Sequence, residues 1–434
     1  MSRLPLQGVR IVDLTVVWGG PYATQLLADW GAEVIRVESR QHFAPLTRGT
    51  VARPPKASQT KEKMIPQGTY CDRDPGQRPW NRFVYFNAHA RNKLSMTVNL
   101  NEPKGIEIFR QLIQKSDVFI ENNALQVVEK WGWTYEALSQ IKPDIIVVNM
   151  PCLGLSGPYK YYRMRGFELE CLAGHTLLRG YTDRDPTTIT DVQHCDAASG
   201  VCAALSIMMA LLHRRRTGQG LHVEVAQAGS LIPQLAQAVM DYTMNQRIQG
   251  TVGNRDPSAA PCGCYPCRGE DKWVNITVTS DEEWDALRRA MGNPPWSEEE
   301  RFSDGLSRWH NQDELDRRIE EWTKQHDHDA IMYMLQKDGV PAGAVLDSGD
   351  CFIDPHLKER GFFEPLTQAE CGTHLYPGLS WRMSKTPNKL RLPPCRLGEH
   401  NEYVYKQVIG VSDEEYARLE AEGHIGMDFV PEIP

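Results

Sequence analysis

The sequence predicts an α/β protein that has a Rossmann-like large domain with a mostly parallel sheet, and a second, smaller α+β domain. Short runs of β-branched residues alternate with amphipathic stretches through the first half of the chain, which is typical of βαβ units. The chain has 434 residues, of which 41% are hydrophobic. Since a single core stops growing at about 250–300 residues, two domains are expected.

The expected strands and helices of the large domain follow one another through the first 150 residues. In order, the alternating segments are RIVDLT, the helical PYATQLLADWG, EVIRVE, LSMTVNL, the helical PKGIEIFRQLIQKS, DVFIEN and, after another helical stretch, IIVVNM. Between Ser39 and Asn81 the chain is rich in Pro, Arg, Lys, Thr and Gln and shows no periodicity. This segment is therefore predicted to be a long surface excursion.

A long apolar helix is predicted near the middle of the chain. Residues from Val201 to Leu212 are nearly all apolar and good helix formers, so the helix should begin at Asp196 or just after it and end before Gly218. Asp196 would then lie at or beside the N-cap, where backbone N–H groups and the helix dipole hold a carboxylate ionised. This position suits either a structural cap or a nucleophile, and the residues alone favour the cap.

The second half of the chain predicts a linker and a smaller domain. The expected division is 1–225 for the first part of the large domain, 226–261 for a linker, 262–345 for the small domain and 346–434 for a C-terminal segment. Within the small domain, WVNITV is strand-like, and EEWDALRRAMG and NQDELDRRIEEWTKQ are helical. Leu315, Ile319 and Trp322 line one face of the last helix, which indicates core residues.

Composition argues against several classes of partner. A net charge of −8 disfavours wholesale binding to nucleic acid or to an anionic membrane. The longest apolar run is far shorter than the ~20 residues that a membrane span needs, and a cytoplasmic protein is expected. Eleven cysteines, which are sparse and odd in number, fit reduced thiols better than a disulfide framework.

Two clusters contain the residue types of a metal site. Cys262, Cys264 and Cys267 include a CxxC, but no second CxxC or ordered His pair follows, so strand thiols are the simpler interpretation. In the run HDHD at 326–329, consecutive residues point in different directions on a helix, and an Asp there is a natural N-cap. No metal site is therefore predicted.

A resemblance to a known family covers most of the chain, from about residue 8 to residue 425. The matching segments are GVRIVDLTVVWGGPYATQLLADWGAEVIRVE, NKLSMTVNL, VFIEN, DVQHCDAASG through HRRRTGQG and LHVEVAQ, YPCRGEDKWVNITV, GVPAGAV, DPHLKERGFF and LGEHNEYVYK. Together they resemble the class III CoA-transferases, the family of formyl-CoA transferase, in the carnitine CoA-transferase-like superfamily.

The resemblance implies partners as well as a fold. Acyl-CoA and an organic acid would be the substrates, with coenzyme A held as substrate and no cofactor bound permanently. The C-terminal segment would return to the large domain, and two chains would interlock as linked rings. The second chain would be either another copy or a paralogous chain.

The resemblance also assigns site residues, with Asp196 as the nucleophile. It implies CoA contacts at Trp18, Gly19, Arg40, Arg91, Asn92, Lys93, Asn122, Asn123, Lys130 and Arg165. Some relatives have an acidic residue where this chain has Gly166. Glu168 and Glu170 are close alternatives, and whether either assists catalysis stays open.

The implied reaction moves CoA from an acyl-CoA donor, with succinyl-CoA as the suggested one, to an organic acid through an aspartyl-CoA thioester. Two alternatives remain, a non-catalytic or assisting subunit of a heteromeric CoA-transferase and an isomerase like α-methylacyl-CoA racemase. An NAD-dependent dehydrogenase is disfavoured. Glu38 suits a ribose contact, but WGGPYA lacks the GxGxxG spacing of dinucleotide-binding folds.

Overall fold

The computed structural model describes residues 3–54, 70–185, 188 and 192–434. The chain forms two compact units, a large one of Met1–His175, Asp191–Met240 and Gly361–Pro434, and a small one of Thr176–Thr190 and Asp241–Arg360. The small unit is thus longer than the predicted 262–345. Part of the predicted linker belongs to it, because the Gly253 N–H donates to the Gly180 carbonyl oxygen (3.1 Å) and Asn254 donates to the Tyr181 hydroxyl (3.0 Å).

A six-stranded parallel sheet forms the centre of the large unit, and the predicted α/β fold class is confirmed. Its strand order is β3-β2-β1-β4-β5-β6, the order of a Rossmann sheet, with the direction of winding reversed between β1 and β4. The strands are β1 (Arg10–Leu14), β2 (Glu33–Glu38), β3 (Lys93–Thr97), β4 (Val118–Glu121), β5 (Ile146–Asn149) and β6 (Leu221–Glu224).

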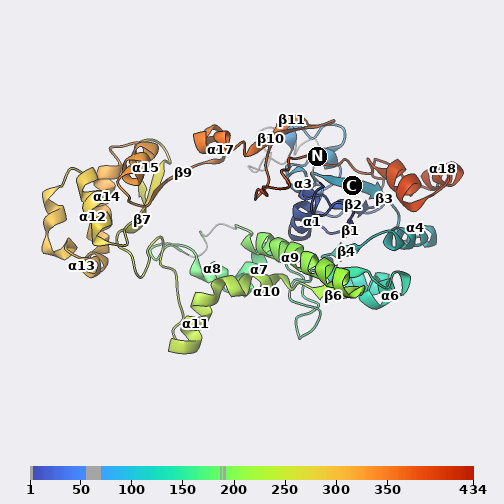
Figure 1. The fold of residues 1–434 in the computed structure, drawn as a ribbon, viewed down its shortest axis with the longest axis horizontal. Coiled ribbons are helices and arrows are strands. Elements are labelled where there is room, and N and C mark those ends of the chain that lie inside the picture. The colour runs from blue at the N-terminus through green and yellow to red at the C-terminus, as the bar shows by residue number, and fades with distance from the viewer. Residues whose placement is uncertain (1–2, 55–69, 186–187, 189–191) are drawn as a thin grey trace. The chain divides into compact units, whose positions relative to one another are not determined.

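Helices cover both faces of this sheet. On one face α1 (Gly19–Asp29) and α9 (His194–Thr217) pack side by side and share a core with β1, β4 and β5, to which Leu27 and Ile207 contribute (Figure 1). Alternate strand residues face the other layer, where α4 (Pro103–Gln114) and a π-helix over Tyr403–Ile409 lie. The remaining helices of this unit are α2 (Pro79–Arg82), α3 (Val84–His89), α5 (Leu125–Trp131), α6 (Tyr135–Ile141), α7 (Gly166–Leu172), α10 (Gln227–Leu231) and α18 (Asp413–Ala421). Two more helices, α8 (His175–Leu178) and α11 (Ala236–Asn245), begin in the large unit and end in the small one.

The C-terminal part of the chain covers the edge strand β3. The Asn401 side-chain oxygen accepts the Thr97 N–H (2.7 Å), and the His400 N–H donates to the Ser95 carbonyl oxygen (2.9 Å). Backbone groups that an edge strand would otherwise expose are thereby paired. The same part of the chain contains a two-stranded hairpin, β10 (Phe363–Gln368) and β11 (Gly372–Pro377).

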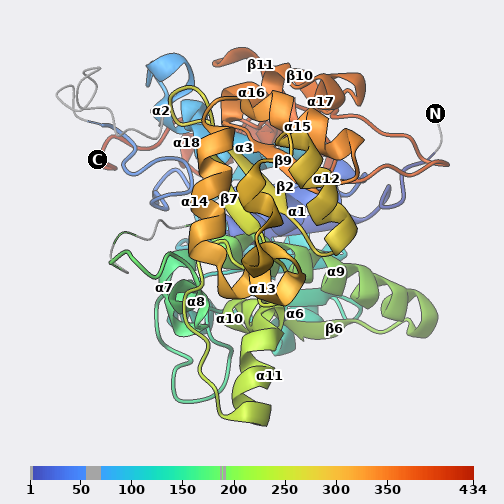
Figure 2. The same ribbon diagram turned by 90° about the vertical axis from the view of Figure 1, so that its left-hand side faces the viewer.

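The small unit is built on an antiparallel sheet of β7 (Cys262–Pro266), β8 (Trp273–Thr277) and β9 (Ala342–Val345). Figure 2 shows helices gathered around this sheet. Leu315 and Ile319 are buried in its core as predicted, and Trp322 packs against them. Its helices are α12 (Asp281–Ala290), α13 (Gly305–His310), α14 (Gln312–Thr323), α15 (His328–Lys337), α16 (Ser348–Ile353) and α17 (Pro355–Glu359).

Candidate active site

Asp196 is the third residue of α9, which begins at His194, two residues before the predicted start. The fully buried carboxylate of Glu170 takes the capping role, since it accepts the backbone N–H groups of His194 and, at 3.3 Å, Cys195. A helix whose first N–H groups are already satisfied does not need Asp196 as its cap. The capping of α9 is therefore assigned to Glu170 and not to Asp196.

Two glycines make room for the Asp196 carboxylate, which is 8% exposed. The Gly19 N–H, at the start of α1, donates to Oδ1 (3.3 Å). A Cβ placed on Gly166 would lie 1.9 Å from Oδ2, which is far inside van der Waals contact. Gly166 is thus required at this position for the carboxylate to keep its place.

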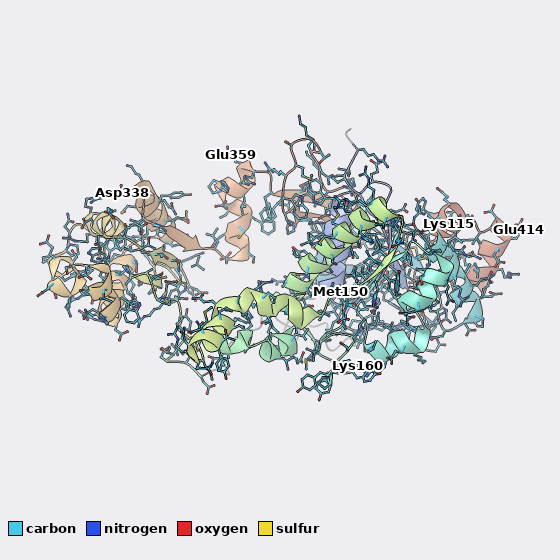
Figure 3. The ribbon with its side chains drawn as sticks, turned by 60° about the horizontal axis from the view of Figure 1, so that its bottom comes forward. Lys115, Met150, Lys160, Asp338, Glu359 and Glu414 are labelled. Carbon is cyan, nitrogen blue, oxygen red and sulfur yellow. The ribbon has the colours of Figure 1, made fainter. Side chains whose placement is uncertain are left out.

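A cavity of about 210 Å³ opens beside Asp196. It is lined by loops that follow the carboxyl ends of β1, β4 and β5, which is where ligands bind in open α/β sheets. Of the described residues that line it, Lys160, Arg163 and Arg165 are cationic and Asp196 is the one carboxylate. Figure 3 labels Lys160, on the loop between β5 and α7, and Met150, which directly follows β5. The electrostatics favour an anionic ligand.

A second, larger cavity of about 540 Å³ lies over the carboxyl ends of β1 and β2. Apolar side chains such as Phe43, Trp131 and Phe429 form much of its wall. Its cationic groups are Arg36, Arg48 and Lys130. Arg36 and Arg48 are paired with the Asp13 and Glu38 carboxylates, so among the described lysines and arginines of this lining Lys130 is left to meet a phosphate-bearing group.

The two cavities meet, because Val16 and Asn123 line both of them. Asn122 fixes the Val16 backbone, accepting its N–H at 2.7 Å and donating to its carbonyl oxygen at 2.9 Å. Asn123 donates to the Leu14 carbonyl oxygen at 3.1 Å. These amides join the loops after β1 and β4, which form the wall that the two cavities share.

Glu38 lines the large cavity but is already paired. Arg48 donates to both of its carboxylate oxygens, at 2.6 and 2.8 Å, and the Ser95 hydroxyl donates at 2.6 Å. Burial alone would raise the pKa of Glu38, but the charges of Arg48 and Arg36 and the hydrogen bonds from Arg48 and Ser95 together hold the pKa below its ordinary value. A carboxylate used in this way is poorly placed to bind a ribose, which agrees with the missing dinucleotide fingerprint.

Arg91, Asn92 and Lys93, which the resemblance assigned to CoA, lie outside the lining of both cavities. Arg91 and Asn92 are buried and donate to the Asp29 carboxylate at 2.8 and 2.7 Å. Lys93 is fully buried and donates to the Pro21 carbonyl oxygen at 2.6 Å. Burial lowers the pKa of Lys93 to about 8. In this structure the segment ties β3 to α1.

The other assigned residues fall into two groups. Asn122, Asn123, Lys130 and Arg165 line one or both cavities, and Gly19 contacts Asp196 directly. Trp18 and Arg40 are in neither lining. The Trp18 ring lies 5.5 Å from the His89 ring, between centroids. Arg40 donates to the backbone of the C-terminal segment, at the Ile425 and Asp428 carbonyl oxygens.

Sequence reasoning predicted Lys130 and Arg165 but missed four other cations at the two cavities. Arg36 lies within β2 and Arg48 in the predicted surface excursion, whose residues 55–69 lie outside the described part of the chain. Lys160 and Arg163 belong to a loop with no periodic pattern. The position of Lys160 after a buried strand was the one available signal, because loops that follow parallel strands carry binding residues.

Comparison with known proteins shows which protein family this chain matches. Residues 6–401 match the family model described as CoA-transferase family III. The succinyl-CoA–D-citramalate CoA-transferase of Chloroflexus aurantiacus is 29% identical over 96% of this chain and 97% of its own length. The formyl-CoA:oxalate CoA-transferase of Bradyrhizobium diazoefficiens is 27% identical over 96% of each chain.

Two further relatives bear on assembly and fold. The beta subunit of the succinyl-CoA–L-malate CoA-transferase of Chloroflexus aurantiacus is 26% identical over 95% of this chain and 96% of its own length. The crystal structure of a CAIB/BAIF family protein from Brucella suis superposes with a TM-score of 0.80 and 29% identity. That match covers 94% of this chain and all of the other (100%).

Proposed function

The chain belongs to CoA-transferase family III and is an enzyme of this class, and on that premise we propose that Asp196 carries CoA as a thioester between a donor and an acceptor acid. The observation that supports this most is the pair of adjoining cavities. The adenosine diphosphate part of CoA would occupy the large cavity, and the pantetheine arm would pass Val16 and Asn123 to end at Asp196.

The proposed reaction begins with attack of an Asp196 carboxylate oxygen on the thioester carbonyl carbon of the donor. The carbon–sulfur bond breaks, CoA leaves as its thiolate, and a mixed anhydride forms. The thiolate then attacks the Asp196 carbonyl carbon and releases the donor acid, leaving an aspartyl-CoA thioester. In the second step the CoA thiolate is still bound beside the reacting carbon, so its attack does not require a new encounter.

Transfer to the acceptor repeats these steps in reverse order. The acceptor carboxylate attacks the aspartyl thioester and expels the CoA thiolate. That thiolate attacks the acceptor carbonyl, forms the new acyl-CoA and frees the Asp196 carboxylate. The Gly19 N–H, 3.3 Å from Oδ1 at the positive end of α1, supports the negative charge that develops on this oxygen at each attack on the Asp196 carbonyl carbon.

We further propose succinyl-CoA as the donor and a dicarboxylic acid as the acceptor. One carboxylate of the acceptor would react with the aspartyl thioester, and the other would pair with Lys160, Arg163 or Arg165 in the small cavity. The named relatives that use succinyl-CoA together with D-citramalate or L-malate support this choice.

A second chain of the same fold is proposed as partner, either an identical copy or a paralogue. Five apolar side chains project from the outer face of α9 at helical spacing, and they are between 41% and 64% exposed. They are Val201, Leu205, Met208, Met209 and Leu212. By length and composition α9 could also cross a membrane, but its packing against α1 makes it a core helix that needs a cover on one side only.

The test is intact-protein mass spectrometry after brief incubation with a panel of acyl-CoA donors, comparing the wild type with Asp196→Ala. We expect an adduct equal to CoA less one water on the wild type alone, lost when a dicarboxylic acid is added. Asp196→Ala should abolish transfer and keep CoA binding. Absence of any adduct, despite CoA binding, would favour the assisting subunit or the racemase.

A further inference from the structure

A cluster of possible metal ligands lies in the large unit, apart from both cavities. Cys71 and Asp72 belong to a single 3-10 turn over Cys71–Arg73, and His374 lies on β11. One donor atom from each of these three side chains lies within 4.8 Å of the other two. Among the described residues, no other group of three such side chains meets this criterion.

The distances within the cluster suit a tetrahedral ion. The Cys71 Sγ lies 3.7 Å from the His374 Nε2 and 3.6 Å from the Asp72 Oδ2, and the His374 Nε2 lies 4.0 Å from the Asp72 Oδ1. Tetrahedral zinc with bonds of 2.0–2.3 Å separates its ligand atoms by about 3.4–3.7 Å. The two distances from the Cys71 Sγ fall in this range, but they and the His374 contact involve different Asp72 oxygens, so the Asp72 carboxylate would have to turn to offer one oxygen to the ion.

The backbone at this turn is held in a conformation that aims the carboxylate at the thiol. Asp72 has a φ of 55° and Arg73 a φ of 58°, both in the left-handed region, which Asp tolerates better than most residues. Non-glycine residues persist there only when their surroundings fix them. The Arg82 guanidinium does part of this, donating to the Cys71 carbonyl oxygen at 3.0 Å.

We propose that Cys71, Asp72 and His374 bind a zinc ion, with water in the fourth position. One thiolate, one imidazole and one carboxylate form a mixed set that zinc accepts, whereas magnesium and calcium prefer oxygen ligands throughout. The Asp72 side chain is 61% exposed and the His374 side chain 41%, so the open position faces solvent. The ion would clip the Cys71–Arg73 turn to the β10–β11 hairpin.

Binding has two local costs. The Cys71 thiol donates to the Cys371 carbonyl oxygen at 3.5 Å, and burial raises the pKa of Cys71 to about 12, so the ion must displace a proton. The His374 Nε2, now 2.7 Å from the Cys371 carbonyl oxygen, must give up that hydrogen bond.

The experiment uses the full chain, reduced, stripped with a chelator and titrated with zinc in competition with a chromogenic chelator. We expect one zinc per chain. His374→Ala and Cys71→Ser should each weaken zinc binding by at least about a hundredfold, because each removes a direct ligand. Cobalt substitution should give a thiolate-to-metal charge-transfer band that Cys71→Ser abolishes.

Two controls separate this site from other thiols and from misfolding. Cys264→Ser changes a half-buried cysteine of the CxxC motif and should leave the zinc affinity unchanged. His374→Ala alters a part-exposed side chain, so we expect this variant to keep its fold. It therefore still tests the site if Cys71→Ser fails to fold. Equal zinc affinity in the wild type and His374→Ala, or a cobalt complex without the charge-transfer band, would overturn the proposal.

Discussion

At the scale of single residues, the site depends on the absence of a side chain at Gly166. The Asp196 Oδ2 occupies the space that a methyl group on this residue would take, at 1.9 Å from the ideal Cβ position. Gly166 begins α7 with its backbone buried. The helix and the Asp196 carboxylate therefore meet at one point, and any substitution there acts on this carboxylate first.

We predict that Gly166→Ala lowers kcat by about a hundredfold, because displacing a reacting group by about an ångström has that effect. The KM for the acyl-CoA should change little, since the walls of the large cavity stay in place. Steady-state kinetics with a fixed donor measures both. Gly229→Ala, at an exposed position in α10, is the matched control and should retain full activity.

If Gly166→Ala instead raises KM and leaves kcat intact, the proposed role of Asp196 is contradicted. Such a result would mean that the displaced carboxylate does not react.

The sequence predicted the location of residues that directly follow a strand or begin a helix. Asn122 and Asn123 follow β4 directly and do line the cavities, and Asp196 lies at the start of its helix. Arg91 could not be assigned from sequence, because its partner Asp29 lies 62 positions away. A cation that faces a phosphate and one that faces a buried carboxylate look alike until the chain is folded.

At the scale of elements, the N-terminus of α9 is organised by a neighbouring helix. Glu170 of α7 accepts the first two N–H groups of α9, and the His175 Nδ1 lies 3.3 Å from its other oxygen. The predicted start at Asp196 was wrong by two residues because a cap supplied from α7 leaves no mark in the sequence of α9. Strands, by contrast, were predicted well, since β-branched runs carry their own signal.

We predict that Glu170→Ala speeds hydrogen exchange in the first turn of α9 and lowers the melting temperature, because it leaves buried N–H groups unpaired at a cost of about 1–2 kcal/mol. Glu170→Gln keeps an acceptor oxygen, so its melting temperature should fall less than that of Glu170→Ala. The stability that it loses comes mainly from the interaction of the carboxylate charge with the helix dipole. Exchange measured by mass spectrometry over 192–200 gives the local effect.

Glu168→Gln is the control, because Glu168 is partly exposed and pairs with Arg165 within α7. Faster exchange in this variant, equal to that of Glu170→Ala, would refute the capping role of Glu170.

At the scale of the whole molecule, the outer face of α9 predicts association. Leu205→Glu combined with Met209→Glu should raise the dissociation constant of the assembly by at least about a hundredfold, because it buries carboxylates without partners. Analytical ultracentrifugation of the wild type and the variant measures this. Leu306→Glu, at an exposed leucine of α13, serves as the comparison.

If the wild type stays monomeric when it is expressed alone, an assembly of identical chains is excluded. A paralogous chain would then be left as the proposed partner. A wild type and a variant that associate equally would remove α9 from the interface.

The cover that the C-terminal segment places on β3 has a consequence for how the chain is made. Synthesis runs from the N-terminus, so about 300 residues are added after Thr97 before Asn401 exists to accept its N–H. At 5–20 residues per second this takes roughly 15–60 s. During that time the nascent sheet has an open edge that can pair with another chain. The backbone groups of β3 are thus paired by residues that are synthesised about 300 positions later, and a ribosome that stops before Asn401 releases a chain in which this edge is still open.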